Sequence, residues 1–158
     1  MRLLHNSALP AALLLVIGLS AACGSDDDEP GATTAPAIPA TDITVICSRS
    51  IPALTAEPVT EARLQAAIDK MGEVKTAAAA GDQATANAAF AGDTHTVTHD
   101  IDPPLRANDP LLAQDLCASI VLIEQEFGAN GDMRALTEEA DTAAGLLEQS
   151  GQVLGLFD

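Results

Sequence analysis

The chain has 158 residues and a formal net charge of −16, because 23 Asp and Glu residues outnumber seven Lys and Arg residues. The basic residues stand singly among acids, so the sequence offers no basic patch for phosphates and excludes a nucleic-acid partner. We interpret the acidic excess as a solvated, self-repelling surface.

The first 22 residues have the organisation of an export signal. Arg2 is the fixed positive charge, an apolar segment spans residues 11–19, and small residues at 20–22 precede Cys23. The apolar segment is shorter than the ~20 residues of a membrane-spanning helix, so we expect residues 1–22 to be removed. An ordinary secretory signal with an incidental cysteine would make the protein simply secreted.

The run Leu19-Ser20-Ala21-Ala22-Cys23 resembles the lipobox of bacterial lipoproteins. The resemblance implies that Cys23 is lipidated, for example with palmitate, and becomes the mature N-terminus. The protein would then be anchored to the bacterial membrane, facing the periplasm or the cell exterior. An envelope protein is a possible partner, and the sequence does not name it.

Residues 23–41 form the predicted linker, and residues 42–158 form one predicted domain. The linker contains four consecutive acids and three prolines, and it cannot bury enough apolar surface to offset the entropy of ordering it. The remainder is long enough for one hydrophobic core and too short for two.

The domain is predicted to begin with an extended lead-in and then a helix. Residues 43–47 are apolar and β-branched, and Pro52 and Pro58 follow, which favours an extended segment. Thr60 is a suitable N-cap for a first helix that ends near Gly81. Its apolar residues recur at steps of three and four: Leu64, Ile68, Met71, Val74 and Ala78.

Three more helices follow in the predicted fold. Asp82 can cap the second helix, which has a weak point at Gly92-Asp93 and is expected to end at Pro103-Pro104. Asp109-Pro110 starts the third, and Asp132 caps the fourth. Short connections make neighbours antiparallel, so we predict an all-α, up-down antiparallel four-helix bundle with an extended N-terminal lead-in. The predicted core includes Leu116, Ile120, Ile123, Leu136, Leu147 and Leu154.

Two cysteines remain once Cys23 carries lipid. In an oxidising compartment an even number of cysteines favours a disulfide, here Cys47 with Cys117. Closing a loop of about 70 residues stabilises a fold by roughly 4 kcal/mol in the chain-entropy model. The disulfide would also hold the lead-in against the third helix.

One group of residues on the second helix has the pattern of a metal site. His95 and His99 are four residues apart and Asp102 follows one turn later, so all three share one helix face. Two imidazoles and a carboxylate can bind Zn, Cu, Ni or Fe. The alternative is a pair of exposed or hydrogen-bonded structural histidines, because this face lies opposite the apolar stripe that contains Val97 and Ile101.

Other sequence patterns are weaker candidates for a functional site. Met71 with a histidine could ligate haem, but there is no Cys-x-x-Cys-His attachment motif, and Cys47 and Cys117 are expected to oxidise before they bind a metal. Glu124 and Glu126 are two residues apart and should point to different faces, so we expect a solvated helix end. No catalytic motif supports an enzyme.

Two hypotheses of function follow. The first is a lipid-anchored helical interaction or structural module of the cell envelope that needs no cofactor. The second is a metal-binding protein that uses His95, His99 and Asp102 to sequester or transfer a transition metal.

Overall fold

Seven helices and no strand make up the described part of the chain, which comprises residues 40–157 without residue 129 of a computed structural model. The prediction of an all-α domain is confirmed. The predicted signal, Cys23 and the linker up to residue 39 lie outside the described residues. In chain order the helices are α1 (Ala40–Cys47), α2 (Glu61–Ala79), α3 (Gln83–Phe90), α4 (Asp93–Asp100), α5 (Asp102–Asn108), α6 (Pro110–Glu126) and α7 (Met133–Val153).

The four predicted helix starts are all confirmed. In each case a side-chain oxygen of the N-cap residue accepts a hydrogen bond from a backbone N–H of the first turn, which satisfies a donor that the helix itself leaves unpaired. The four caps are Thr60 for α2, Asp82 for α3, Asp109 for α6 and Asp132 for α7.

The segment predicted as one second helix is divided into α3, α4 and α5. Gly92 adopts a positive φ of 74° between α3 and α4, a conformation that glycine reaches at little cost, so the helix stops and restarts there. The preceding helix does end just before Pro103-Pro104, since α4 stops at Asp100, but both prolines then lie in the first turn of a further helix, α5, which was not predicted. The missing N–H of proline costs nothing at that position, where the helix has no acceptor for it.

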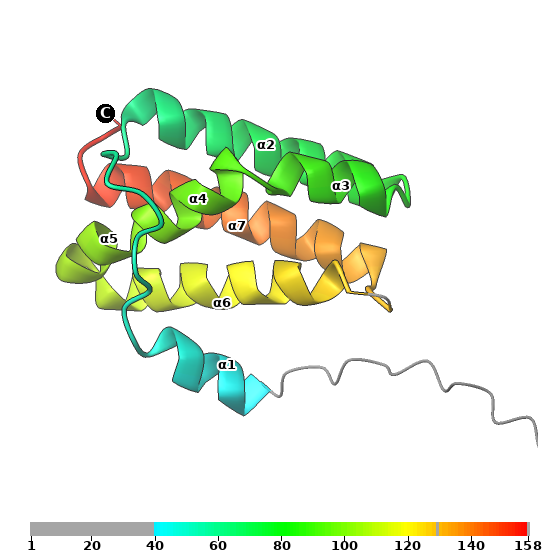
Figure 1. The fold of residues 1–158 in the computed structure, drawn as a ribbon, viewed down its shortest axis with the longest axis horizontal. Helices are drawn as coiled ribbons and strands as arrows, with labels where there is room; N and C mark the ends of the chain where they lie inside the picture. The colour runs from blue at the N-terminus through cyan, green and yellow to red at the C-terminus, as the bar shows by residue number, and fades with distance from the viewer. Residues whose placement is uncertain (1–39, 129, 158) are drawn as a thin grey trace, which may run out of the picture. The chain divides into compact units, whose positions relative to one another are not determined.

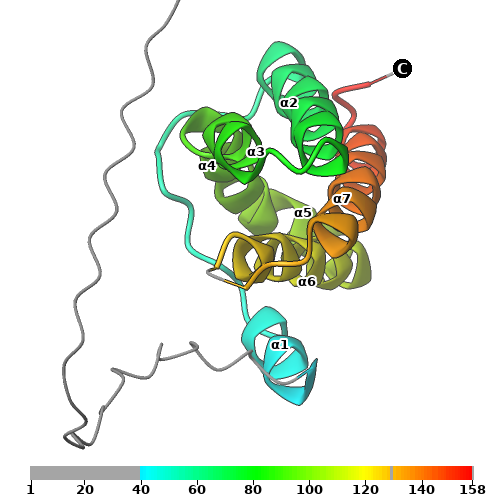
Figure 2. The same cartoon turned by 90° about the vertical axis from the view of Figure 1, so that its right-hand side faces the viewer.

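Three long helices form the frame on which the short ones pack. α7 lies between α2 and α6 and packs against both, while α3 and α4 pack on α2 and α5 packs on α6 (Figures 1 and 2). α2 and α6 run in the same direction and α7 runs in the opposite one (Figure 1). Among the described helices, none is long and apolar enough to cross a membrane.

The core is built largely from leucine, isoleucine and alanine. Of the residues predicted to be buried, Leu154 is the exception, because it caps the end of α7 and remains half-exposed. The other five are buried as predicted: Leu116, Ile120, Ile123, Leu136 and Leu147. Alanines such as Ala67 and Ala140 are also buried, and their small side chains let the helices approach closely.

The lead-in is helical at first, which corrects the prediction that residues 43–47 are extended. Ile43 and Cys47 are four residues apart, so a helix places both on one face, where they are buried with Cys117. This packing outweighs the modest helix penalty of β-branched residues. The predicted disulfide between Cys47 and Cys117 is confirmed, and it joins α1 to α6 with the two Cα atoms 5.6 Å apart.

Candidate metal-binding site

α4 carries two histidines that lie one above the other. His95 and His99 are one helical turn apart, and their ring centroids are 4.7 Å from each other. The ring of His95 also contacts Phe90, with centroids 5.4 Å apart. Phe90 belongs to α3, and the break at Gly92 turns α4 so that the Phe90 and His95 rings meet, although one continuous helix would have kept them on different faces.

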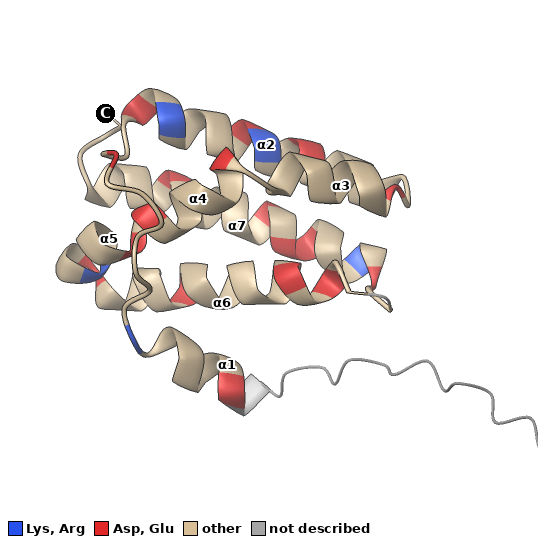
Figure 3. Cartoon of the chain, viewed as in Figure 1, with Lys and Arg blue, Asp and Glu red and all other residues tan. Residues whose placement is uncertain are grey.

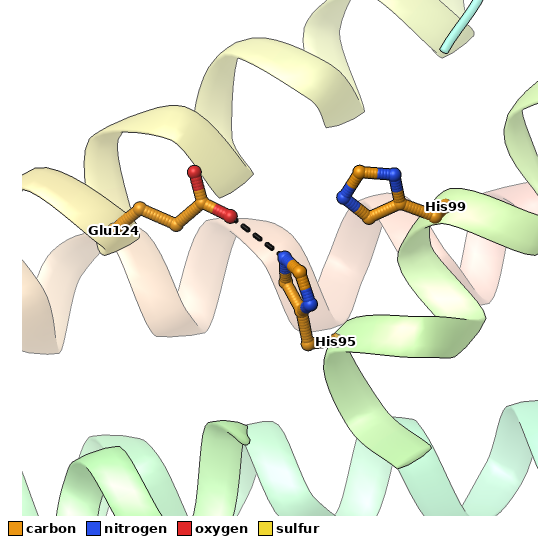
Figure 4. A group of neighbouring side chains, drawn as sticks. All are labelled: His95, His99 and Glu124. Atoms are coloured by element: carbon orange, nitrogen blue, oxygen red, sulfur yellow. Dashed lines mark hydrogen bonds and ion pairs between the residues drawn. The ribbon is translucent and has the colours of Figure 1, made fainter. Parts of the chain in front are cut away.

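Glu124 on α6 completes a group of three donors with the two histidines (Figure 4). The Oε1 atom of Glu124 lies 2.8 Å from Nε2 of His95. One donor atom from each of His95, His99 and Glu124 can be chosen so that all three lie within 4.8 Å of one another. Both histidines are half-buried and Glu124 is exposed, so an ion can reach the group from solvent.

The three donors match the requirements of a first-row transition metal. Zinc bonds of about 2.0 to 2.2 Å in a tetrahedral arrangement place neighbouring donors about 3.3 Å apart. The longest separation, at most 4.8 Å, would therefore close by up to about 1.5 Å on binding, and the 2.8 Å contact between Glu124 and His95 would open by about 0.5 Å. Small side-chain rotations allow both changes. Two histidines and one glutamate form a known zinc ligand set, and two imidazoles with a carboxylate also suit Cu, Ni and Fe.

Asp102, which the sequence suggested as the third ligand, lies elsewhere. Its carboxylate is 3 % exposed, accepts hydrogen bonds from the backbone N–H of Ile51 at 2.9 Å and the hydroxyl of Ser50 at 3.0 Å, and pairs with Arg106 at 2.7 Å. The helix stops at Asp100 and restarts as α5 at Asp102, which turns Asp102 away from the imidazoles and toward the helix-free segment 48–59. We therefore replace Asp102 by Glu124 in the candidate site.

Asp100, a second buried aspartate, holds the other half of segment 48–59. It accepts hydrogen bonds from the backbone N–H groups of Leu54 at 2.8 Å and Thr55 at 2.9 Å, and from Arg63 of α2 at 3.0 Å. Burial raises the pKa of Asp100, but the hydrogen bonds from Thr55, Arg63 and Leu54 outweigh burial and leave the pKa below its ordinary value.

Arg63 also pairs with Asp93, the first residue of α4, at 2.9 Å. One guanidinium of α2 therefore contacts carboxylates at both ends of the helix that carries His95 and His99. These contacts fix α4, so the two imidazoles are presented from an element that is held at both ends.

The remaining candidates from the sequence are occupied by structural contacts. Met71 is completely buried in the main core, and the sulfurs of Cys47 and Cys117 are bonded to each other. Glu126 accepts a hydrogen bond from the backbone N–H of Asp132, at the start of α7. Glu124 and Glu126 thus have different partners, as their spacing suggested, but the contact of Glu124 with a histidine was missed.

The missed contact depends on two facts that a single helix does not reveal. Glu124 meets His95 only because α4 is a separate helix, and because α4 and α6 pack with one particular register. The useful signal was the pairing of a His-x-x-x-His helix with an acid near the end of the next long helix. This pattern limits the choice of the third donor to Glu124 or Glu126, but it does not distinguish between the two.

The chain as a whole carries far more acids than bases, 23 Asp and Glu against seven Lys and Arg. Lys and Arg residues are few and separate in Figure 3, and most are already paired with carboxylates: Arg63, Lys70, Lys75, Arg106 and Arg134. A surface with this charge raises the local concentration of cations.

Comparison with known proteins gave no match to this chain, whether with protein-family models, with curated proteins or with solved structures. The functional argument accordingly rests on the site itself.

Proposed function

We propose that this chain is an exported, lipid-anchored bacterial protein whose helical domain binds one transition-metal ion through His95, His99 and Glu124. The observation that carries the proposal is the meeting of these three donors from two helices within 4.8 Å. The role would be sequestration or transfer of the metal at the cell envelope.

Three features support metal binding in addition to the distances. The imidazoles come from one face of α4, which Arg63 holds at both ends through Asp93 and Asp100. The carboxylate comes from a different helix, so the donors approach the ion from two sides, as a tetrahedral site requires. The acidic surface favours the approach of a cation.

Two further parts of the proposal rest on the sequence pattern. The small residues before Cys23 and the acidic, proline-containing stretch after it favour lipidation of Cys23 and a tether to the membrane. We also interpret the domain as an up-down four-helix bundle in which α3, α4 and α5 together take the place of the second helix.

A helical interaction or structural module is the second candidate function. It is favoured by apolar side chains at the start of α6 and the end of α7, where Leu111 is 70 % exposed and Val153 is 40 % exposed. Both residues line one shallow groove, and such a surface suits contact with an envelope protein. In this function the histidines would be structural and no metal would bind.

Calorimetric titration with Zn²⁺, Cu²⁺ and Ni²⁺ distinguishes the two functions. The untagged parent is compared with His95→Ala, His99→Ala and Glu124→Gln, and Glu126→Gln serves as the matched control on the same helix. We expect one ion per chain in the parent, loss of most binding in either histidine variant, weaker binding in Glu124→Gln, and parental affinity in the control.

Two results would count against the metal site. One is binding no tighter than exposed surface histidines give. The other is parental affinity in a protein that carries both alanine substitutions. Either result would leave the interaction module as the remaining function.

A further inference from the structure

The two ring nitrogens of His99 face different surroundings. Figure 4 shows one nitrogen of its ring, the one farther from the backbone, directed toward His95 and Glu124. This atom is Nε2, and it is the nitrogen that belongs to the candidate metal site. The other nitrogen, Nδ1, is directed away from that site.

Nδ1 of His99 is buried and has no hydrogen-bond partner among the described residues. A buried polar atom without a partner is costly, and native structures usually supply a protein group or an ordered water molecule. Whether Nδ1 carries the hydrogen also determines the state of the other ring nitrogen. A neutral imidazole carries its hydrogen on one nitrogen and a lone pair on the other, so the partner of Nδ1 decides whether Nε2 can bind a metal.

A small cavity of about 10 Å³ adjoins His99 and has room for a water molecule. Most of its lining is apolar and includes Leu105, Leu116 and Ile120, and its polar lining comes from His99, Thr98 and Asp102. The Oδ2 atom of Asp102 accepts one hydrogen bond among the described residues, from Arg106, and a carboxylate oxygen can accept a second.

We propose that Asp102 positions His99 through one water molecule in this cavity. The water accepts a hydrogen bond from Nδ1–H of His99 and donates one to Oδ2 of Asp102, which fixes the tautomer whose Nε2 lone pair faces Glu124 and His95. Metal-binding histidines commonly donate their second N–H to a carboxylate, a carbonyl or a water in this way. The inference rests on the proposed function, because it explains how a ligand of that site is oriented.

The tautomer of His99 can be measured without any metal. Nitrogen-15 NMR of the imidazole rings, on the purified full chain as the host exports and processes it, distinguishes Nδ1–H from Nε2–H. We expect Nδ1–H for His99 in the metal-free parent at alkaline pH, where imidazole is neutral. The opposite tautomer would overturn the inference.

Asp102→Asn tests the carboxylate directly. Three donors point at Oδ1 of Asp102, from Ser50, Ile51 and Arg106, so the asparagine oxygen should occupy that place and its NH₂ group the place of Oδ2. The water would then face a donor instead of an acceptor. We expect a shift of His99 toward Nε2–H and a loss of zinc affinity of about 10- to 100-fold.

Asp100→Asn is the matched control. Asp100 is also buried and holds the same segment, through Leu54 and Thr55, but it does not line the cavity. The control should keep the parental tautomer of His99; its zinc affinity is not compared, because Asp100 also holds α4 through Arg63. An equal shift of the tautomer in both variants would mean that Asp102 acts only by holding the segment, and would overturn the inference.

A cavity-filling variant keeps the test decisive if Asp102→Asn does not fold. Ala113 is buried and lines the cavity, so Ala113→Val should displace the water while leaving Asp102 in place. It should change the tautomer and the affinity in the same direction as Asp102→Asn, and an unchanged tautomer would refute the role of the water.

An Nδ1–H parent that binds no metal would support the positioning by Asp102 and refute the proposed function. A metal-binding parent with Nε2–H on His99 would do the reverse.

Discussion

Replacing both Cys47 and Cys117 with serine should lower the free energy of unfolding by about 2 to 4 kcal/mol. The two cysteines are 70 residues apart in the sequence, and closing a loop of that length removes enough freedom from the unfolded chain to account for about 4 kcal/mol. This figure is the upper bound of the effect.

The structure explains why the loss should be smaller than that bound. α1 has eight residues, too few for a stable helix on its own, and Ile43 and Cys47 are the side chains that it buries. Without the disulfide, α1 can detach from α6 while the main core stays folded. The freedom that α1 then regains stabilises the folded state of the variant and offsets part of the loss.

Urea unfolding followed by circular dichroism measures the difference. Both proteins should carry Cys23→Ser, so that no other thiol can pair. At a slope of about 2 kcal/mol per molar urea, the midpoint of the serine variant should fall by about 1 to 2 M. Hydrogen exchange should become fastest in α1. Equal midpoints for the two proteins, or two titratable thiols at residues 47 and 117 of the exported protein, would refute the reasoning.

Ile123→Ala should lower the free energy of unfolding by about 2 to 5 kcal/mol and Leu122→Ala by distinctly less. The reason is that Ile123 is completely buried in the main core while Leu122 is partly exposed beside α1. Thermal or urea unfolding that gives the reverse order would contradict this. Asp100 has a lowered pKa in the folded protein, so it stabilises the fold above the ordinary aspartate pKa of about 3.9, and this contribution is lost as the pH falls through the lower, folded value. Asp100→Asn should therefore be less stable than the parent at neutral pH, and the difference should shrink below about pH 4; a constant difference in unfolding midpoints down to pH 2 would argue against it. Mass spectrometry should find diacylglycerol on Cys23 at the mature N-terminus, and a Cys23→Ser protein that still partitions with membranes would speak against lipid anchoring.

Features set by neighbouring residues were predictable from the sequence. The caps Thr60, Asp82, Asp109 and Asp132 were identified correctly, because a cap depends on one side chain and the first turn that follows it. The weak point at Gly92 was also recognised, since glycine needs no tertiary contact to adopt a positive φ. The Cys47–Cys117 pairing followed from the number of cysteines.

Features set by packing between segments distant in the sequence were not predictable from the sequence. The helical form of residues 43–47 depends on burial of one face against α6, which their β-branched composition does not reveal. The two histidines were found by their spacing, but the third donor was assigned to Asp102 on the assumption of one continuous helix. The breaks on either side of α4 turn Asp102 toward Ser50 and Ile51, and the register between α4 and α6 brings Glu124 to His95.

The most direct test of the metal site is elemental analysis of the protein after equilibration with Zn²⁺ and removal of the free ion. The parent and Glu126→Gln should each retain one zinc per chain, and a variant with both His95→Ala and His99→Ala should retain none. Equal zinc in the parent and the double variant, or no zinc in the parent, would contradict the assignment of His95, His99 and Glu124 as a metal site.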